Sequence, residues 1–206
     1  MDSLSRIQKQ ELRSCKTETI TNCGLTAAQL ESRVGNPAGT DKPDVPNPNY
    51  KGKIVYLNGK LHINLNYVLT GNIYRAEIGL KNIKDIFAAG GAIVNFIPNP
   101  TKVDIRIHGA ALAEITQGLK LCTCEAGLFI GGWAPAPDHS QWGNALLLGS
   151  TPAKNSWKMT DAHEFGHKLG LKHRTDGGMM DYAHPDKPDR RKFTANDCLR
   201  IINLYR

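Results

Sequence analysis

Hydrophobic and polar residues alternate most regularly between residues 61 and 69. Ile63 and Leu65 are apolar there, whereas Asn64 and Asn66 are polar. A period of two is typical of a β-strand that buries one face and exposes the other. The pattern therefore predicts a strand over residues 61–69 with its isoleucine and leucine side chains in a core.

An Asn58-Gly59 pair joins this segment to a second strand candidate at residues 51–57. Asn-Gly favours two-residue hairpin turns, because both residues tolerate the positive φ angles that such turns require. We therefore expect an antiparallel hairpin at the start of a sheet. Four later segments are further strand candidates: residues 92–97, 102–108, 128–133 and 144–148.

Two other segments have the periodicity of a helix. In residues 73–87 the predicted buried face contains one polar residue and consists of Ile73, Glu77, Leu80, Ile83 and Phe87. The second helix is predicted at residues 193–205, where Thr194 and Asp197 have the spacing of a capping box. The chain is thus expected to combine a sheet with helices.

The first quarter of the chain has a different character. Short helices are predicted at residues 3–15 and 26–34, and residues 35–49 contain four prolines. Proline-rich stretches are extended and commonly separate domains. We therefore expect residues 1–49 to be a helical and linker segment, either a pro-segment or the join to a longer chain, and residues 50–206 to be the main domain.

Charge and composition narrow the class of protein. The net charge is +7, and the excess lies after residue 49, because the first segment holds six basic and six acidic residues. Lys187, Arg190, Arg191 and Lys192 could attract anionic partners, although a solvated loop is the simpler interpretation. We find no nucleic-acid-binding motif, no apolar run that could span a membrane and no visible signal peptide. The five cysteines are an odd number, so at least one has no partner within the chain.

The most specific chemical signal is the stretch HEFGHKLGLKH at residues 163–173. His163 and His167 are four residues apart, so on a helix they share one face and can bind one Zn²⁺. Gly170 can end the helix with a positive φ, after which His173 supplies a third nitrogen. Three protein ligands leave one coordination position for water, which is typical of catalytic zinc.

Glu164 follows the first of these histidines and would flank the metal without binding it. This is where a general base for a metal-activated water is expected. Two histidines with such a glutamate can arise by chance on an amphipathic helix, but the glycine and third histidine at fixed offsets disfavour a chance match. The motif therefore predicts zinc-dependent hydrolysis.

The same stretch resembles the metzincin signature H-E-x-x-H-x-x-G-x-x-H. The resemblance implies a zinc protease with a methionine turn beneath the metal. Met180 best matches the methionine of that turn, with Met179 as the alternative. Tyr182 stands where some metzincins carry a tyrosine that reaches the metal or the developing oxyanion, and a tyrosine of the core is the alternative role.

Within the metzincins, residues 161–171 resemble the active-site helix of matrixins, and residues 193–205 resemble their last helix. The resemblance implies an α+β fold, with a twisted mixed β-sheet and two long helices above the cleft. A small irregular lower subdomain would begin at Gly170 and end with the C-terminal helix. The opening hairpin would add one strand to this plan.

Two further expectations concern substrate binding. Residues 127–135 resemble the matrixin edge strand that pairs with substrate backbone, and we favour them over residues 144–148 for that role; core packing of both is the alternative. Arg174 follows the third histidine, where matrixins usually have serine. It is expected either to meet an acidic substrate side chain or to pair with Asp176 or Asp181.

These observations predict a zinc endopeptidase that acts on protein or peptide substrates, with zinc on the three histidines, Glu164 as general base and Tyr182 assisting. One alternative is a toxin-like effector domain of a larger secreted protein, with the same chemistry and an inhibitory or immunity protein as partner. Both imply action outside the producing cell. The other alternative, a non-catalytic zinc-bearing interaction module, has no need of Glu164.

Overall fold

The computed structural model describes six parts of the chain: residues 43–111, 114–115, 131–149, 157–174, 178–181 and 192–206. The helices predicted at residues 3–15 and 26–34 lie outside them. A short 3-10 helix, Pro48–Tyr50, precedes the sheet and buries the ring of Tyr50. Among the described residues, no helix has the length and apolar character needed to cross a membrane.

The predicted hairpin is confirmed. It consists of β1, Ile54–Leu57, and β2, Lys60–Gly71, which pair antiparallel. The turn residues Asn58 and Gly59 have φ angles of 52° and 77°, the positive values that an Asn-Gly turn provides. Alternation along β2 also agrees with the pattern, because its isoleucine and first leucines are buried while its asparagines are partly exposed.

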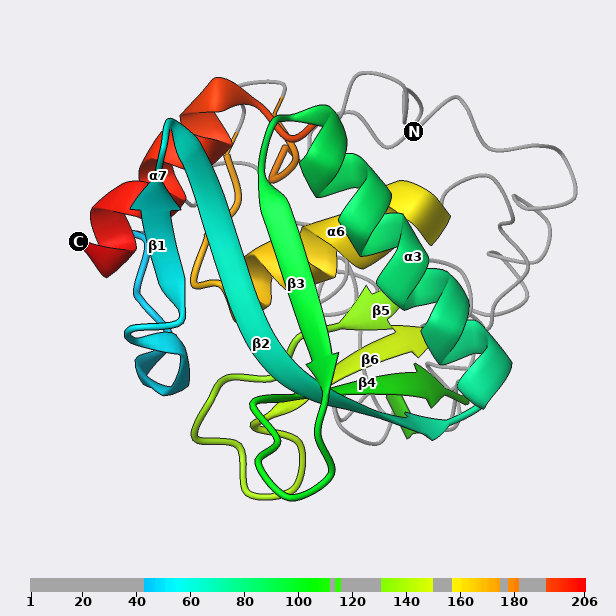
Figure 1. Ribbon diagram of the computed structural model, residues 1–206. Helices are drawn as coiled ribbons and strands as arrows, with labels where there is room; N and C mark the ends of the chain where they lie inside the picture. The colour runs from blue at the N-terminus through cyan, green and yellow to red at the C-terminus, as the bar shows by residue number, and fades with distance from the viewer. Residues whose placement is uncertain (1–42, 112–113, 116–130, 150–156, 175–177, 182–191) are drawn as a thin grey trace, which may run out of the picture.

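The sheet is mixed and curled (Figure 1). Its other strands are β3, Ile93–Pro98; β4, Ile105–Ala110; β5, Gly132–Trp133; and β6, Ala145–Gly149. The order is β1-β2-β4-β6-β5, and β3 pairs with the first part of β2. Pairing is parallel among β2, β3, β4 and β6, and antiparallel for β1 and β5.

Three helices of the described residues complete the α+β fold. α3, Ile73–Ala89, and α6, Trp157–Lys168, pack against each other, and α7, Ala195–Tyr205, lies beside β1 (Figure 1). The capping box predicted for the last helix is confirmed, since Thr194 and Asp197 exchange both bonds. The fold class expected from the sequence is therefore correct, whereas the addition of one strand to the family plan stays a prediction.

The buried face of α3 differs from the predicted one. Ile83 is buried as expected, but Ile73 and Glu77 are exposed. The helix instead approaches the sheet at Gly79, where a Cβ would lie 2.0 Å from Cδ1 of Leu148. Apolar periodicity cannot detect such a contact, because glycine has no side chain to contribute to the pattern.

A buried ion pair joins α3 to α6. Arg75 and Asp161 are almost fully buried, and their side chains approach at 2.5 Å and 3.1 Å through two nitrogen–oxygen pairs. Asn82 Nδ2 donates to the same carboxylate at 2.8 Å, and Arg75 Nε donates to Gly149 O at 2.9 Å. These bonds fix the start of α6 against α3 and the end of β6.

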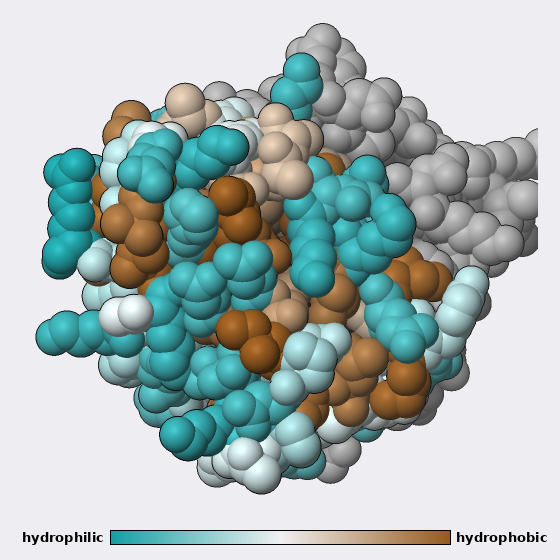
Figure 2. All heavy atoms as spheres, in the orientation of Figure 1, coloured by the Kyte–Doolittle hydropathy of each residue, from teal (hydrophilic) through white to brown (hydrophobic). Residues whose placement is uncertain are grey.

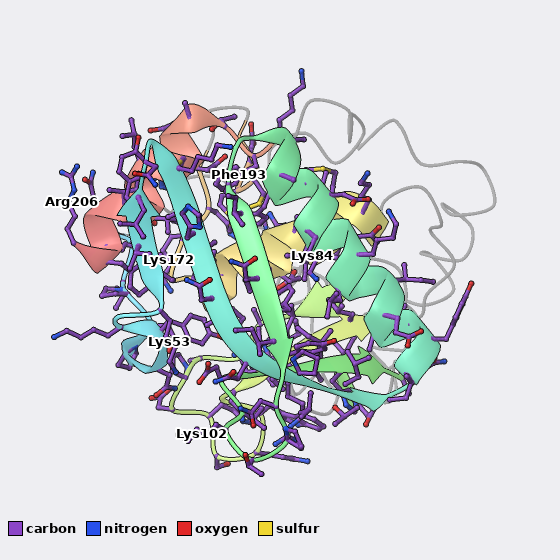
Figure 3. All side chains as sticks on the ribbon, viewed as in Figure 1. Lys53, Lys84, Lys102, Lys172, Phe193 and Arg206 are labelled. Atoms are coloured by element: carbon purple, nitrogen blue, oxygen red, sulfur yellow. The ribbon has the colours of Figure 1, made fainter. Side chains whose placement is uncertain are left out.

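Phe165, between the first two motif histidines, anchors α6 in the main core. Its ring lies 5.3 Å from that of Phe87 and 5.5 Å from that of Phe96. Phe193, labelled in Figure 3, stacks on Phe87 at 4.4 Å and so joins the approach to α7 to the same core. On the face shown in Figure 2, hydrophobic patches are scattered among hydrophilic side chains.

Candidate metal centre and cleft

The three motif histidines converge. His163 and His167 project from α6, and His173 reaches them from the turn that follows. The Nε2 atoms of His163 and His167 lie 3.2 Å apart, those of His163 and His173 3.2 Å, and those of His167 and His173 3.0 Å. Within the described ranges, these three histidines form the one cluster of at least three histidine, cysteine or acidic side chains that could hold a metal ion.

This geometry fits zinc. Bonds of about 2.0–2.1 Å at tetrahedral angles would separate the ligand nitrogens by roughly 3.4 Å, close to the observed spacing. The carbonyl oxygens of Met179 and Leu171 accept bonds from His163 Nδ1 at 3.0 Å and His167 Nδ1 at 2.8 Å. A carbonyl can only accept, so these bonds place the ring protons on Nδ1 and leave the Nε2 lone pairs for a metal. Burial lowers the pKa of His167 well below its ordinary value, which keeps that ring neutral.

Glu164 borders the same cleft. Burial raises the pKa of its carboxyl group to about 7; the charge of Asp161 adds to the rise, while the Ala134 N–H and the charge of Lys168 oppose it. Gly132 allows β5 to approach Glu164 on α6 closely, since a Cβ at position 132 would lie 2.8 Å from Cγ of that glutamate. A carboxyl group with this pKa can both take up and release a proton near neutral pH.

The edge strand expected from the sequence is confirmed for its described part. β5 is the last strand of the sheet order, and β6 lies between it and β4. Residues 132–133 rather than residues 145–149 therefore form the edge beside the cleft. Residues 127–130 lie outside the described ranges, and pairing with substrate stays a prediction.

Both candidate methionines lie beneath α6. Met179 and Met180 are fully buried, and a Cβ on Gly166 would lie 2.5 Å from the Met180 sulfur and 2.7 Å from Cε of Met179. Gly166 thus lets the turn that contains both methionines pack directly under α6. Met179 N also donates to Asp197 Oδ2 at 3.0 Å, which ties this turn to α7. The choice of Met180 as the turn methionine stays a prediction.

Gly170 has the predicted positive φ, 92°. A Cβ at this position would lie 2.0 Å from the carbonyl oxygen of Val45, a residue of the predicted linker. Val45 N in turn donates to Gly170 O at 3.0 Å. Residues 43–49 thus pack onto the metal-site domain, whereas the division after residue 49 stays a prediction.

Lys168 is a site residue that the sequence did not suggest. It is 2% exposed, and its Nζ donates to Pro135 O at 2.6 Å and Gly143 O at 2.8 Å. Burial lowers its pKa to about 8, and the charge of Glu164 opposes this shift. The lysine thereby fixes the loop between β5 and β6, which borders the cleft, to the end of α6. A lysine on a polar helix position normally indicates a solvated face, so only its packing reveals this role.

Arg174 has a partner that neither expectation included. Its Nη2 lies 3.9 Å from Asp44 Oδ1, and its backbone N–H donates to Met180 O at 3.0 Å. Asp181 pairs with it as a backbone bridge, whereas Asp176 lies outside the described residues.

Several other residues from the sequence analysis also lie outside the described ranges: Tyr182, the basic residues 187–191 and four of the five cysteines. The remaining cysteine, Cys198, is half-buried, and burial raises the pKa of its thiol.

These residues surround a cleft of about 700 Å³. One wall comes from β5 and the loop after it, another from α6 with the turn to His173, and a third from Val45, Pro46, Asn47 and Pro48. A cleft of this size can accept several residues of an extended peptide. The three motif histidines and Glu164 lie along it, so a chain bound there would pass them.

Comparison with known families gives a match over more than half of the chain. The matrixin family model matches residues 94–206, which include β3 to β6, α6 and α7. No curated protein is similar enough to count as a match. The curled mixed sheet and the placement of the motif agree with that family, which consists of zinc-dependent metalloproteases. This chain therefore belongs to the matrixin family.

Proposed function

We propose that this protein is a zinc endopeptidase in which Glu164 is the general base. The observation that carries the proposal is the convergence of three histidine Nε2 atoms beside a carboxyl group whose pKa is about 7, in one open cleft. A non-catalytic zinc module would have no use for that carboxyl group. Family membership supports metalloprotease activity in general.

His163, His167 and His173 would hold zinc, which when bound acts as a Lewis acid and lowers the pKa of a water molecule. Glu164 accepts the proton of that water and returns it to the leaving amine. The Ala134 N–H fixes its carboxylate, and burial raises its pKa above the ordinary value. Carbonyl acceptors on two of the imidazoles hold those rings in position.

The substrate we propose is an extended peptide segment. β5 has an open side at the end of the described sheet, and adding a strand to such an edge is a common mode of peptide recognition. Tyr182 is proposed to assist at the oxyanion, by resemblance to metzincins that carry a tyrosine there. Export from the producing cell and an inhibitory partner remain predictions without support from the fold.

Metal analysis and a hydrolysis assay test this proposal. Purified protein should contain about one equivalent of zinc, as expected for one set of three ligands. It should cleave a denatured protein, lose that activity with a chelator and regain it with zinc. Failure to bind zinc on reconstitution would exclude the proposed site.

Glu164→Gln provides the matched control, because the amide is nearly isosteric with the carboxyl group. This variant should keep its zinc and its unfolding temperature while hydrolysis falls by about 10²–10⁴-fold. Activity equal to that of the wild type in zinc-loaded Glu164→Gln would show that the base lies elsewhere.

A further inference from the structure

The backbone between the second and third histidines is held by distant segments. We call residues 168–172 the ligand loop and residues 44–47 the N-terminal strap. Three carbonyl oxygens of the ligand loop accept bonds from outside it: Lys168 O from Asn47 Nδ2 at 3.1 Å, Leu169 O from the Tyr205 hydroxyl at 3.1 Å, and Gly170 O from Val45 N at 3.0 Å. Two of these donors belong to the N-terminal strap.

Asp44 and Arg200 hold the last residue of the ligand loop from both sides. Asp44 Oδ1 accepts a bond from Lys172 N at 2.8 Å, and Arg200 Nη2 donates to Lys172 O at 2.8 Å. Lys172 directly precedes His173 in the chain. Fixing both its N–H and its C=O therefore constrains where the backbone of His173 begins and in which direction it runs.

The two bracketing side chains also bind each other. Arg200 Nε donates to Asp44 Oδ2 at 2.8 Å, and Arg200 Nη2 donates to Oδ1 at 2.7 Å. The side chains are only 12% and 11% exposed, so this bidentate pair is well shielded from solvent. Charge-assisted bonds that are shielded from solvent are electrostatically stronger than those of exposed ion pairs.

The same arginine is linked to a second ligand through α7. Arg200 Nη1 lies 3.5 Å from Asp197 Oδ1, and Asp197 Oδ2 accepts the bond from Met179 N. The carbonyl of Met179 in turn accepts from His163 Nδ1. Asp44 thus joins an ionic network that reaches the backbone beside His173 and the imidazole of His163.

We propose that Asp44 is a positioning residue for the metal centre: paired with Arg200, it fixes Lys172 and so places His173 for metal binding. The inference rests on the proposed function of the site. Asp44 lies outside the matched range of residues 94–206, so the N-terminal strap is a part of the catalytic unit that the family match does not cover. Removing a residue that orients a metal ligand typically lowers metal affinity or activity by about 10–100-fold.

The test measures zinc binding in the full chain. Asp44→Asn keeps an oxygen for Lys172 N but removes the charge that binds Arg200. Asp85→Asn is the control, because Asp85 pairs with Lys81 and Lys158, neither of which bonds Lys172 or Arg200. We expect zinc affinity, from chelator competition, to fall about tenfold or more in Asp44→Asn and to be unchanged in Asp85→Asn. The visible spectrum of the cobalt-substituted protein should change in Asp44→Asn, and kcat should fall more than KM rises.

Arg200→Lys supplies a second, independent variant, which retains a charge but cannot make the two-nitrogen contact. It should weaken zinc binding, and the effects of Asp44→Asn and Arg200→Lys should be non-additive in the double variant. Asp44→Glu, the conservative change, should recover more of the zinc affinity than Asp44→Asn. Unchanged zinc affinity and cobalt spectrum in both single variants would overturn the inference.

The inference and the proposed function can fail separately. A wild-type protein that binds zinc but cleaves no protein would contradict the proposed function, while the affinity and spectra of the variants would still test Asp44. A wild type that hydrolyses protein beside an Asp44→Asn variant with normal zinc affinity would leave the function intact and exclude the positioning role.

Discussion

The sheet region and the ligand loop are held together by different kinds of contact. In the sheet region, β2, α3 and α6 enclose a continuous apolar core that includes the rings of Phe87, Phe96 and Phe165. In the ligand loop, backbone groups are bonded by Asp44, Asn47 and other polar side chains, and the two ends of the described chain meet there. Leu169 and Leu171 of the ligand loop are also buried in that core, so directional bonds are added to burial in the second region.

This difference follows from what each region must do. Burial is non-directional, so a core tolerates small shifts and is well suited to hold α6 in place. A metal ligand must stay within a fraction of an ångström of its position, and directional bonds can achieve this. His163 and His167 are placed by a helix that is fixed in the core, whereas His173 depends on a loop held by the N-terminal strap and α7. Changes in the two regions should therefore affect stability and metal binding unequally.

The largest effect on stability is expected from breaking the buried pair in the sheet region. Asp161→Ala leaves the Arg75 guanidinium buried without its carboxylate, which should reduce the free energy of unfolding by about 3–5 kcal/mol. Asp85→Ala removes a more exposed carboxylate and should cost about 1 kcal/mol or less. Denaturant unfolding of both variants would measure this, and equal losses would contradict the burial of the pair as the cause.

A truncation series tests the boundary between the segments. The sequence predicts that residues 1–49 are a segment separate from the main domain, whereas the packing of residues 44–47 leads us to expect different results from two start points. A chain from residue 43 keeps every bond between the N-terminal strap and the ligand loop and serves as the reference. A chain from residue 50 loses the bonds to Gly170, Lys172 and Arg200 and should be less stable by about 2–4 kcal/mol.

Zinc affinity measured on the same two chains separates the regions further. Because the N-terminal strap acts on the ligand loop, the chain from residue 50 should bind zinc more weakly while far-ultraviolet circular dichroism still reports the sheet and helices. Equal zinc affinity in the two chains would mean that the ligand loop keeps its shape without the N-terminal strap.

A change at the edge strand probes the side of the cleft formed by the sheet. In Gly132→Ala the new Cβ would lie 2.8 Å from Cγ of Glu164 and 3.0 Å from Leu147 O. The carbonyl cannot move aside easily, so we expect a stability loss of about 1–3 kcal/mol from overpacking. Activity should fall while zinc affinity stays normal, since no histidine of the cluster is displaced. Gly91→Ala serves as a comparison for backbone strain, because φ is positive there and a Cβ would meet nothing within 4 Å.

The smallest effect concerns pH. Burial alone would raise the pKa of Asp44, but the bonds from Arg200 and the Lys172 N–H outweigh it, so the pKa is lowered from its ordinary value of 3.8. The ionised carboxylate therefore stabilises the fold above that ordinary value, and the contribution is lost as the pH falls through the lowered pKa of the folded state. The free energy of unfolding of the wild type should exceed that of Asp44→Asn by about 1–2 kcal/mol at neutral pH. This difference should shrink in strong acid. A difference independent of pH would exclude a role for the charge.

Much of the fold could be predicted because its signals are local. The Asn58-Gly59 turn and the capping box at Thr194 depend on the residues themselves and their immediate neighbours, and both are confirmed. The convergence of the three histidines was predictable for the same reason, since two of them lie on one helix with Glu164 and the third follows a glycine with positive φ. The buried face of α3 was predicted wrongly at Ile73 and Glu77, because Gly79 approaches the sheet without an apolar side chain to mark it.

The sequence by itself therefore determined the cluster of three histidines, the hairpin and the class of fold, because neighbouring residues specify each of them. Only the tertiary structure decided how the cleft is completed and how the backbone beside His173 is held. Asp44 lies 128 residues before Lys172 and 156 before Arg200 in the chain, and Lys168 bonds carbonyl groups in a different loop. No periodicity or motif connects such positions, since a hydrogen bond between distant segments depends on where the whole chain places them.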